Sequence, residues 1–281
     1  MHGFLIDLDG VVYDGDRVIP GAADAIAFLN QHHLPHLFVT NTSSVPARVV
    51  WQKLRFLGIE VPLRSILTPM IAARQWIRAN GREPVAAFVP RPTLADFEGL
   101  NLLPPDVEVG ARAIVIGDLG DQWDYRKLNR AFRLLDNAGE QGCLIALGMT
   151  RFCKAEDGRL RLDVAPFVKA LEHSSYIEPT VMGKPAADFF QQAADSLSMP
   201  MSELIMIGDD IYSDIHGAQR CGMRGLLVKT GKFREQDINS DVRPDAILRS
   251  IADLPQWIRQ QPWSEGLHEK PFVSKVLDAA F

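Results

Sequence analysis

The stretch Gly3-Phe-Leu-Ile-Asp-Leu-Asp-Gly-Val-Val-Tyr-Asp14 places two carboxylates, two positions apart, at the end of a short apolar run. An apolar run of this length predicts a buried strand of a parallel sheet. Two like charges at its end would repel each other, so Asp7 and Asp9 point to a cation between them, at the carboxyl edge of the sheet. One aspartate would then attack an electrophile while the other transfers a proton. The alternative is a strand that stops at a polar Asp-Gly turn.

Composition restricts the function classes. The chain has 281 residues, of which 47% are hydrophobic and 23% charged, as in ordinary soluble globular proteins. The net charge is −5 and no basic run occurs, so we expect no nucleic-acid partner and no membrane surface. We see no basic leader and no membrane-spanning apolar stretch. The three cysteines, Cys143, Cys153 and Cys221, are too far apart in sequence to suggest a metal site or a disulfide framework. A cytoplasmic protein is therefore expected.

Strands and helices are predicted to alternate in two parts of the chain. The strands are expected at residues 4–7, 35–40, 203–207, 225–228 and 246–248. The helices are expected at residues 22–32, 46–57, 69–79, 186–197, 213–221 and 251–261. This alternation predicts an α/β fold, with a doubly wound, Rossmann-like parallel sheet and right-handed crossovers.

The middle of the chain has a strand and helix pattern of its own. Its strands are expected at residues 85–89, 113–116 and 143–147, and its helices at 124–137 and 164–173. We therefore predict a core formed by residues 1–79 and 180–281, interrupted by an inserted α/β domain at 80–179.

Two further segments carry groups that suit an anion. In Leu37-Phe-Val-Thr-Asn-Thr-Ser-Ser44, a strand ends in Thr40 and Asn41 and small hydroxyl residues lead into a helix. Such a turn offers hydroxyl, amide and backbone N–H donors, although this segment taken alone is better explained by a simple helix cap at Ser43 or Ser44. In Met182-Gly-Lys-Pro185, Lys184 stands in a short loop before a helix, where it can reach a phosphate or be an ordinary surface lysine.

The segment Leu204-Ile-Met-Ile-Gly-Asp-Asp-Ile-Tyr-Ser-Asp214 is a second apolar strand that ends in acidic residues. Asp209 would complete an all-oxygen site for Mg²⁺, while Asp210 and Asp214 would act from outside the ligand set. The alternative for Asp214 is an acidic residue favoured near a helix N-terminus. All four segments fall at the carboxyl ends of predicted strands, where ligands bind in open α/β sheets.

In this order, the four segments resemble the motifs of the haloacid dehalogenase superfamily of magnesium-dependent phosphohydrolases. The position of the insert resembles that of the subclass with the large α/β cap called C2. Segments at 146–158, 163–172, 217–223 and 229–233 resemble the phospholysine phosphohistidine inorganic pyrophosphate phosphatases and their relatives. In the animal members of that group a serine replaces the second aspartate of the first motif, whereas this chain has Asp9.

The resemblance implies a role for each motif residue in the hydrolysis of a small phosphorylated substrate. Asp7 would be the nucleophile and Asp9 the general acid and base. Mg²⁺ would be held by Asp7, the backbone carbonyl of Asp9, and Asp209. The phosphoryl oxygens would be bound by Thr40, the N–H of Asn41 and Lys184.

Three questions stay open from the sequence. Arg151 and Lys154 are candidates for substrate contacts in the cap, with a solvated cap face as the alternative, and Asp118, Asp121 and Trp123 form another candidate rim. A homo-oligomer through the cap is a further expectation. The rival functions are a dehalogenase or phosphomutase, and a catalytically silent phospho-ligand-binding or scaffold protein with the same fold.

Overall fold

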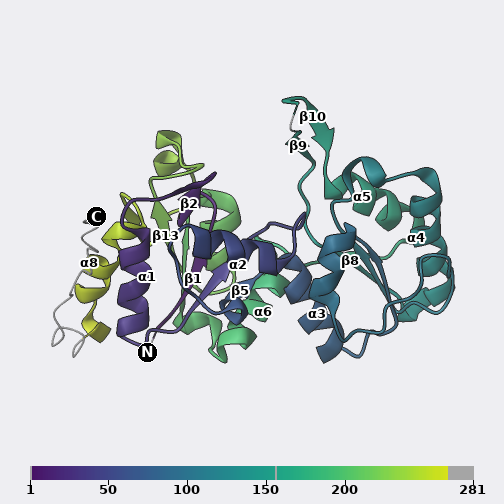
Figure 1. Cartoon of the computed structure of the whole chain (residues 1–281), viewed down its shortest axis with the longest axis horizontal. Coiled ribbons are helices and arrows are strands. Elements are labelled where there is room, and N and C mark those ends of the chain that lie inside the picture. Colours follow the sequence, from purple (N-terminus) through teal and green to yellow (C-terminus); the bar gives the residue numbers. More distant parts are fainter. Residues whose placement is uncertain (1, 156, 265–281) are drawn as a thin grey trace, which may run out of the picture. The chain divides into compact units, whose positions relative to one another are not determined.

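The computed structural model describes residues 2–155 and 157–264, which fall into two compact units (Figure 1). The first unit comprises Met1–Phe38, Arg55–Glu60 and Met199–Phe281, and the second comprises Val39–Leu54 and Val61–Ser198. Each unit has a parallel sheet with helices packed on it.

The sheet of the first unit has β1 in its interior. Its strands lie in the order β14-β13-β12-β1-β4, and β1, β12, β13 and β14 pair in parallel. β4, the next strand of this sheet along the chain, lies on one side of β1 and β12 lies on the other, so the strand order reverses at β1. The bounds are β1 (Gly3–Asp7), β4 (His36–Val39), β12 (Leu204–Gly208), β13 (Arg224–Val228) and β14 (Ala246–Leu248).

The register of β1 and β12 brings two acidic segments to one edge of this sheet. Ile6 pairs with Ile207, so Asp7 ends β1 at the level where β12 ends in Gly208. Both strands are buried along their whole length, as their continuous apolar sequences predict.

The helices of the first unit show amphipathic spacing. In α1 (Ala22–Gln31) the buried positions 22, 25, 26, 28 and 29 recur at helical intervals and face the core. Figure 1 shows α1 beside α8 (Leu254–Arg259), and the two helices are in contact. After β12 the chain forms a π-helical turn (Ile211–His216) followed by the short helix α7 (Gly217–Arg220).

The second unit has a four-stranded sheet in the order β11-β8-β7-β6, with all pairs parallel. Helices α4 (Tyr125–Ala138) and α5 (Val164–Ser175) contact each other and pack on this sheet (Figure 1). Their core includes Leu134, Leu144 and Val168, which are fully buried. The strands are β6 (Val85–Phe88), β7 (Ala113–Ile116), β8 (Cys143–Ala146) and β11 (Pro179–Val181).

The remaining elements are short or connect those above. A hairpin of β2 (Tyr13–Asp14) and β3 (Arg17–Val18) follows β1, and a second hairpin pairs β9 (Phe152–Lys154) with β10 (Leu160–Leu162). In the second unit, β5 (Ile66–Leu67) lies beside the end of β4, where Thr40 N donates to Leu67 O at 3.2 Å. The other helices are α2 (Ala47–Phe56), α3 (Pro69–Ala79) and α6 (Ala187–Leu197).

The α/β class and the parallel sheets predicted from the sequence are confirmed. The helix expected over residues 213–221 differs, because Asp210 caps the chain earlier and the first turns are π-helical. The helix expected over 251–261 is α-helical only in α8, after a 3₁₀ turn at Ile251–Asp253. The domain boundaries at residues 80 and 179 stay a prediction; the second unit also takes in residues on either side of that block.

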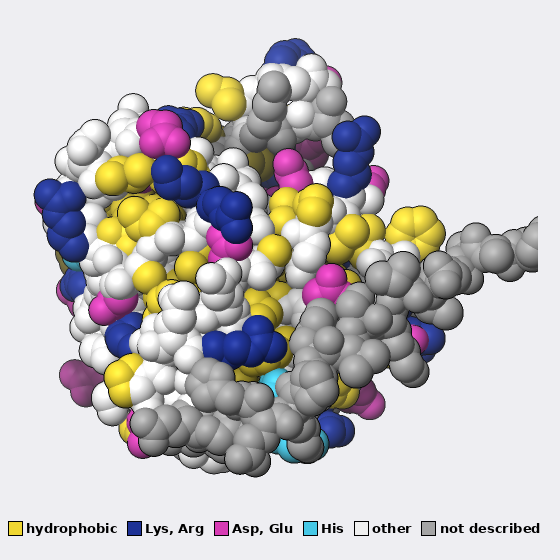
Figure 2. Space-filling view, turned by 90° about the vertical axis from the view of Figure 1, so that its left-hand side faces the viewer, with side chains coloured by type: hydrophobic (Ala, Val, Ile, Leu, Met, Phe, Trp, Pro, Cys, Tyr) yellow, Lys and Arg dark blue, Asp and Glu magenta, His cyan; other side chains and the backbone are white. Residues whose placement is uncertain are grey.

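No helix among residues 2–155 and 157–264 is long and apolar enough to cross a bilayer. On the face drawn in Figure 2, the Lys and Arg side chains of the described residues lie among Asp and Glu side chains and not in one continuous basic patch. This distribution agrees with the small negative net charge.

We expect the Leu134→Ala substitution to destabilise the second unit by about 2–5 kcal/mol, because it leaves a cavity among fully buried side chains. Alanine favours helix, so the loss would come from packing and not from α4 itself. Urea unfolding followed by circular dichroism measures the change. As a control, Phe56→Ala at an 86% exposed position should change the free energy of unfolding by less than about 0.5 kcal/mol. Equal losses in both variants would contradict this account of the core.

Candidate active site

The two carboxylates of the first motif lie in different environments. Asp7, the last residue of β1, is only 7% exposed, whereas Asp9 is exposed to solvent. Asp9 lies in the tight turn that follows β1, in which Leu8 O accepts a hydrogen bond from Val12 N at 2.8 Å. One carboxylate is therefore held in the protein and the other is free to exchange protons with water or substrate.

The acidic residues after β12 are fixed by short backbone contacts. Asp209 and Asp214 are 1% and 0% exposed. Asp214 Oδ2 accepts a hydrogen bond from Asp210 N at 3.2 Å, and Asp210 Oδ1 accepts from Tyr212 N and Ser213 N at 3.1 and 3.0 Å. These bonds form the π-helical turn that directs Asp214 back toward the strand end, a local irregularity that is frequent at functional sites.

Glycines make room for these carboxylates. A Cβ atom at Gly208 would lie 2.2 Å from Asp214 Oδ2. A Cβ at Gly10 or at Gly231 would lie 2.0 Å from Asp209 Oδ2. Gly10 and Gly231 also have φ of +85° and +60°, which glycine adopts without strain. The carboxylate of Asp209 is thus enclosed by two glycine backbones that no other residue could replace without displacing it.

The loop after β13 joins this site. Thr230 Oγ1 donates a hydrogen bond to Gly10 O at 2.5 Å, and Lys232 N donates to Asp209 Oδ2 at 2.6 Å. Sequence reasoning assigned no role to this loop. The available signal was the Thr230–Gly231 pair just after an apolar strand, which alone does not show that the loop returns to β1.

Three carboxylates come together at the strand ends. Asp7, Asp209 and Asp214 each offer an oxygen, and these oxygens lie within 4.8 Å of one another. All three residues are buried, where like charges repel strongly unless a cation lies among them. An all-oxygen, acidic donor set fits a hard divalent cation. Asp214, expected outside the ligand set, therefore has a carboxylate oxygen in the cluster, whereas Asp9 contributes no side chain to it.

The negative charge of the site affects its neighbours. Burial, together with the charges of Asp9 and Asp7, raises the pKa of the Tyr13 hydroxyl well above its usual value. At Asp210, burial raises the pKa, but the N–H bond from Ser213 and the nearby charge of Lys232 outweigh it, so the pKa is lowered overall. Both shifts keep these groups in one protonation state at neutral pH, Tyr13 neutral and Asp210 ionised.

The phosphate-binding candidates Thr40, Asn41 and Lys184 belong to the second unit. Lys184 N donates to Asn41 Oδ1 at 2.8 Å, and Asn41 Nδ2 donates to Lys184 O at 2.9 Å. Thr40, directly after β4, is buried, and its hydroxyl accepts a hydrogen bond from Thr42 N at 3.1 Å. Lys184 is only 6% exposed, and its ammonium group lies 3.5 Å from Val39 O. The structure thus brings Asn41 and Lys184 together, with the Asn41 side chain holding the lysine loop.

The predicted cap contacts lie on or beside the β9–β10 hairpin (Figure 1). Arg151 is exposed, with its guanidinium 5.9 Å from the centre of the Phe152 ring. Lys154 is in β9, and its side chain lies outside the described part of the structure. Of the other rim candidates, Asp118 is engaged in a two-bond ion pair with Arg161 at 2.6 and 2.8 Å, which lowers the pKa of its carboxyl.

Trp123, also considered as a rim residue, is a packing residue. Its ring stacks on Phe88 and Phe167 at centroid distances of 5.9 and 4.7 Å. Asp121 is exposed in the 3₁₀ turn that precedes it.

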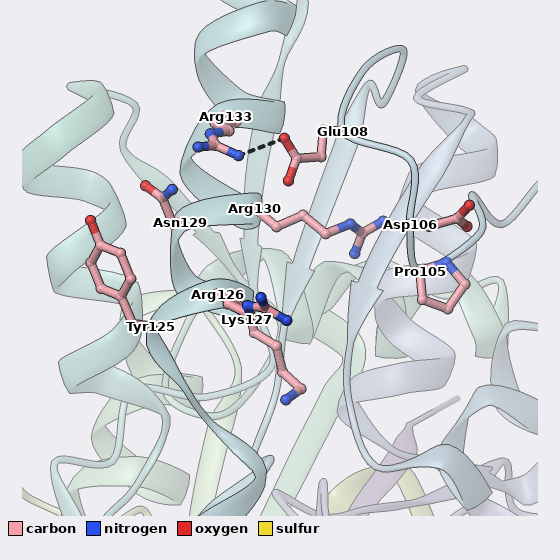
Figure 3. A pocket seen from close by; sticks show the side chains of 9 residues that line it. All are labelled: Pro105, Asp106, Glu108, Tyr125, Arg126, Lys127, Asn129, Arg130 and Arg133. Carbon is pink, nitrogen blue, oxygen red and sulfur yellow. Dashed lines mark hydrogen bonds and ion pairs between the residues drawn. The ribbon is translucent and has the colours of Figure 1, made fainter.

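A hollow of about 570 Å³ lies elsewhere in the second unit, between α4 and the loop at residues 105–108 (Figure 3). Arg126, Lys127, Arg130 and Arg133 project from α4 toward it. No residue of the four sequence motifs lines this hollow.

Known proteins resemble this chain over most of its length. The haloacid dehalogenase-like hydrolase model matches residues 4–102 and the HAD-hydrolase-like model matches residues 181–254. The human phospholysine phosphohistidine inorganic pyrophosphate phosphatase is 34% identical over 265 residues, which cover 92% of this chain and 95% of that protein. The chain belongs to the haloacid dehalogenase-like hydrolases. Bovine haloacid dehalogenase-like hydrolase domain-containing protein 2 is 37% identical, covering 84% of this chain and 87% of that one.

Solved structures show the same fold. A hypothetical protein from Pyrococcus horikoshii has a TM-score of 0.81 at 26% identity and covers 92% of this chain and 100% of its own. A variant of the thermostable p-nitrophenylphosphatase from Bacillus stearothermophilus has a TM-score of 0.77 at 27% identity, and the match covers 90% of this chain and 98% of that one. This haloacid dehalogenase-like hydrolase therefore has the Rossmann-like fold with a C2 cap, and it is a phosphatase.

We expect Gly10→Ala to lower phosphatase activity by about 10²-fold or more, because the added Cβ would push the Asp209 carboxylate out of place. Gly15→Ala is the matched control: its φ is also positive, at +54°, but nothing lies within 4 Å of the new Cβ. Turnover of p-nitrophenyl phosphate and thermal unfolding are measured for both variants. If both lose activity equally, backbone strain and not contact with Asp209 is responsible.

Proposed function

We propose that this chain is a magnesium-dependent phosphohydrolase that forms an aspartyl-phosphate on Asp7 and acts on a small phosphorylated substrate. The observation that carries the proposal is the cluster of Asp7, Asp209 and Asp214 beside the exposed Asp9. Membership of the hydrolase family supports it. The substrate would be a phosphate monoester, a phosphoamide or pyrophosphate, since relatives are named for phospholysine, phosphohistidine, inorganic pyrophosphate and p-nitrophenyl phosphate.

In the first step, a carboxylate oxygen of Asp7 attacks phosphorus. A bond from that oxygen to phosphorus forms, the bond to the leaving group breaks, and protonated Asp9 gives its proton to the leaving atom. In the second step, a water molecule attacks phosphorus while Asp9 takes a proton from that water. The bond to Asp7 breaks and inorganic phosphate is released. The exposure of Asp9 supports this role, because substrate and water must both reach it.

The charge of the phosphoryl group would be neutralised by a metal ion and by polar groups of the protein. Asp7, Asp209 and the backbone carbonyl of Asp9 would bind Mg²⁺, which when bound neutralises charge on the phosphoryl oxygens. We propose that Thr40, the N–H of Asn41 and Lys184 bind the same phosphoryl group. The burial of Lys184 supports this, because an ammonium group shielded from water interacts more strongly with an anion. Asp210 and Asp214 would act from outside the ligand set, by holding the metal ligands in position.

Two rival functions are less well supported. A dehalogenase has no need of a metal site, so the carboxylate cluster favours hydrolysis of a phosphate. A silent binding or scaffold protein has no need of an exposed proton donor at Asp9. Turnover of p-nitrophenyl phosphate with Mg²⁺ separates the rivals. Cap contacts by Arg151 and Lys154, a homo-oligomer through the cap and a cytoplasmic location stay predictions.

Asp7→Asn should abolish turnover, because an amide cannot attack phosphorus. The variant should stay folded, and without metal its melting temperature should be no lower than that of the wild type, because one of three buried charges is removed. Asp9→Asn should lower turnover by about 10²–10⁴-fold. It should also let a phosphorylated protein accumulate, which intact-mass spectrometry detects. An Asp7→Asn variant with wild-type rates on any phosphoester would exclude the covalent mechanism.

Chelation should stop the reaction and Mg²⁺ should restore it. Bound Mg²⁺ should also raise the melting temperature, because it relieves repulsion among buried carboxylates. Asp209→Ala should raise the Mg²⁺ concentration needed for half-maximal activity and abolish most of the melting shift. Full activity in EDTA, with no metal detected in the protein, would refute the assignment.

A further inference from the structure

A second hollow, of about 510 Å³, opens beside Asp209 in the first unit. Its lining includes the acidic residues Asp209, Asp210 and Asp237 and two basic residues, Lys232 and Arg234. Neither basic residue was singled out as a site residue by the sequence motifs. The hollow therefore places two cations next to a site whose own side chains are acidic.

Lys232 is positioned by the site itself. Its N–H holds Asp209 Oδ2 at 2.6 Å, and two residues earlier Thr230 is bonded to Gly10 O in the loop of the first motif. The backbone of Lys232 is thus fixed from both acidic loops. The Lys232 side chain therefore extends from a fixed backbone position next to Asp209, a candidate metal ligand.

The charged ends of both side chains are available to a ligand. The Lys232 side chain is 68% exposed, and its ammonium group lies 3.7 Å from Asp210 Oδ2. An exposed pair at this distance contributes little to stability, so structural pairing does not account for the lysine. Arg234 is exposed as well, and its backbone N–H donates to Asp237 Oδ2 at 2.7 Å.

In the basic hollow on α4, the charged side chains are less available to a ligand (Figure 3). Arg133 bonds Glu108 at 2.8 Å and Lys127 pairs with Asp124. Arg130 donates to Pro104 O and Val107 O, both at 2.9 Å. Most of its cations are already hydrogen-bonded within the protein, whereas beside Asp209 the ammonium group of Lys232 has, among the described residues, only the exposed 3.7 Å ion pair with Asp210.

We propose that Lys232 and Arg234 form a subsite for an anionic leaving group, such as the second phosphate of pyrophosphate. The proposal rests on the phosphohydrolase function above. When the bond to the leaving group breaks, that group gains negative charge, and an ammonium group nearby stabilises it by a charge-assisted hydrogen bond. Substrates with a second phosphate would therefore be favoured over aryl esters, because the second phosphate is charged before the bond breaks, whereas the aryl group carries only the charge that develops on its oxygen.

The test compares pyrophosphate and p-nitrophenyl phosphate as substrates of the full chain with Mg²⁺. Lys232→Ala keeps the backbone N–H that bonds Asp209, and we expect it to lower the ratio of kcat/KM values, pyrophosphate over aryl phosphate, by about tenfold or more. Arg234→Ala should lower the same ratio, and Lys232→Arg should restore most of it. Arg249→Ala, which removes an 86% exposed cation elsewhere in the first unit, controls for net charge and should leave the ratio unchanged.

Imidodiphosphate, an analogue with a P–N–P bridge, gives a second readout as an inhibitor of aryl-phosphate turnover. Its inhibition constant should rise in Lys232→Ala by a similar factor. The subsite is refuted if both substrates are affected equally, or if the wild type neither hydrolyses pyrophosphate nor is inhibited by imidodiphosphate. In those cases the wild-type turnover of p-nitrophenyl phosphate would still support the proposed function. If the wild type turned over no phosphorylated substrate at all, the proposed phosphohydrolase function would itself be refuted.

Discussion

Mutual repulsion among three buried carboxylates is the constraint on which the catalytic part of this structure depends. Asp7, Asp209 and Asp214 come from the ends of two parallel strands and a π-helical turn, and their oxygens lie within 4.8 Å. An arrangement of this kind is unfavourable in a fold selected for stability alone. It is maintained by contacts that no side chain could replace, above all the glycine backbones around Asp209 and the N–H groups of Lys232 and Asp210.

The separate roles proposed for Asp7 and Asp9 follow from their places at the end of β1 and in the turn directly after it. The first is at the end of a buried strand and the second is in solvent, although only one residue separates them. A nucleophile benefits from a fixed position near a cation, whereas an acid and base must exchange protons. One tight turn therefore provides two chemical environments.

Most of the core fold could be predicted from the sequence, because strands such as 204–208 are continuous apolar runs followed by acidic residues. The four motifs were found for the same reason, since polar groups at the ends of parallel strands share one edge. The hairpin of Phe152–Lys154 and Leu160–Leu162 was not found, because three-residue strands with exposed apolar side chains show no usable period. The return of the loop at Thr230 to Gly10 depends on a contact between residues 220 positions apart, which local patterns do not encode.

The reciprocal amide bonds between Asn41 and Lys184 have an evolutionary consequence. They join two segments 143 residues apart, so the long stretch between them leaves and returns at nearly the same point. The entropic cost of closing a loop grows only slowly with its length. Insertions, deletions or replacements in the stretch between them can therefore accumulate without moving Lys184, so this part of the chain can diverge while the lysine loop stays the same.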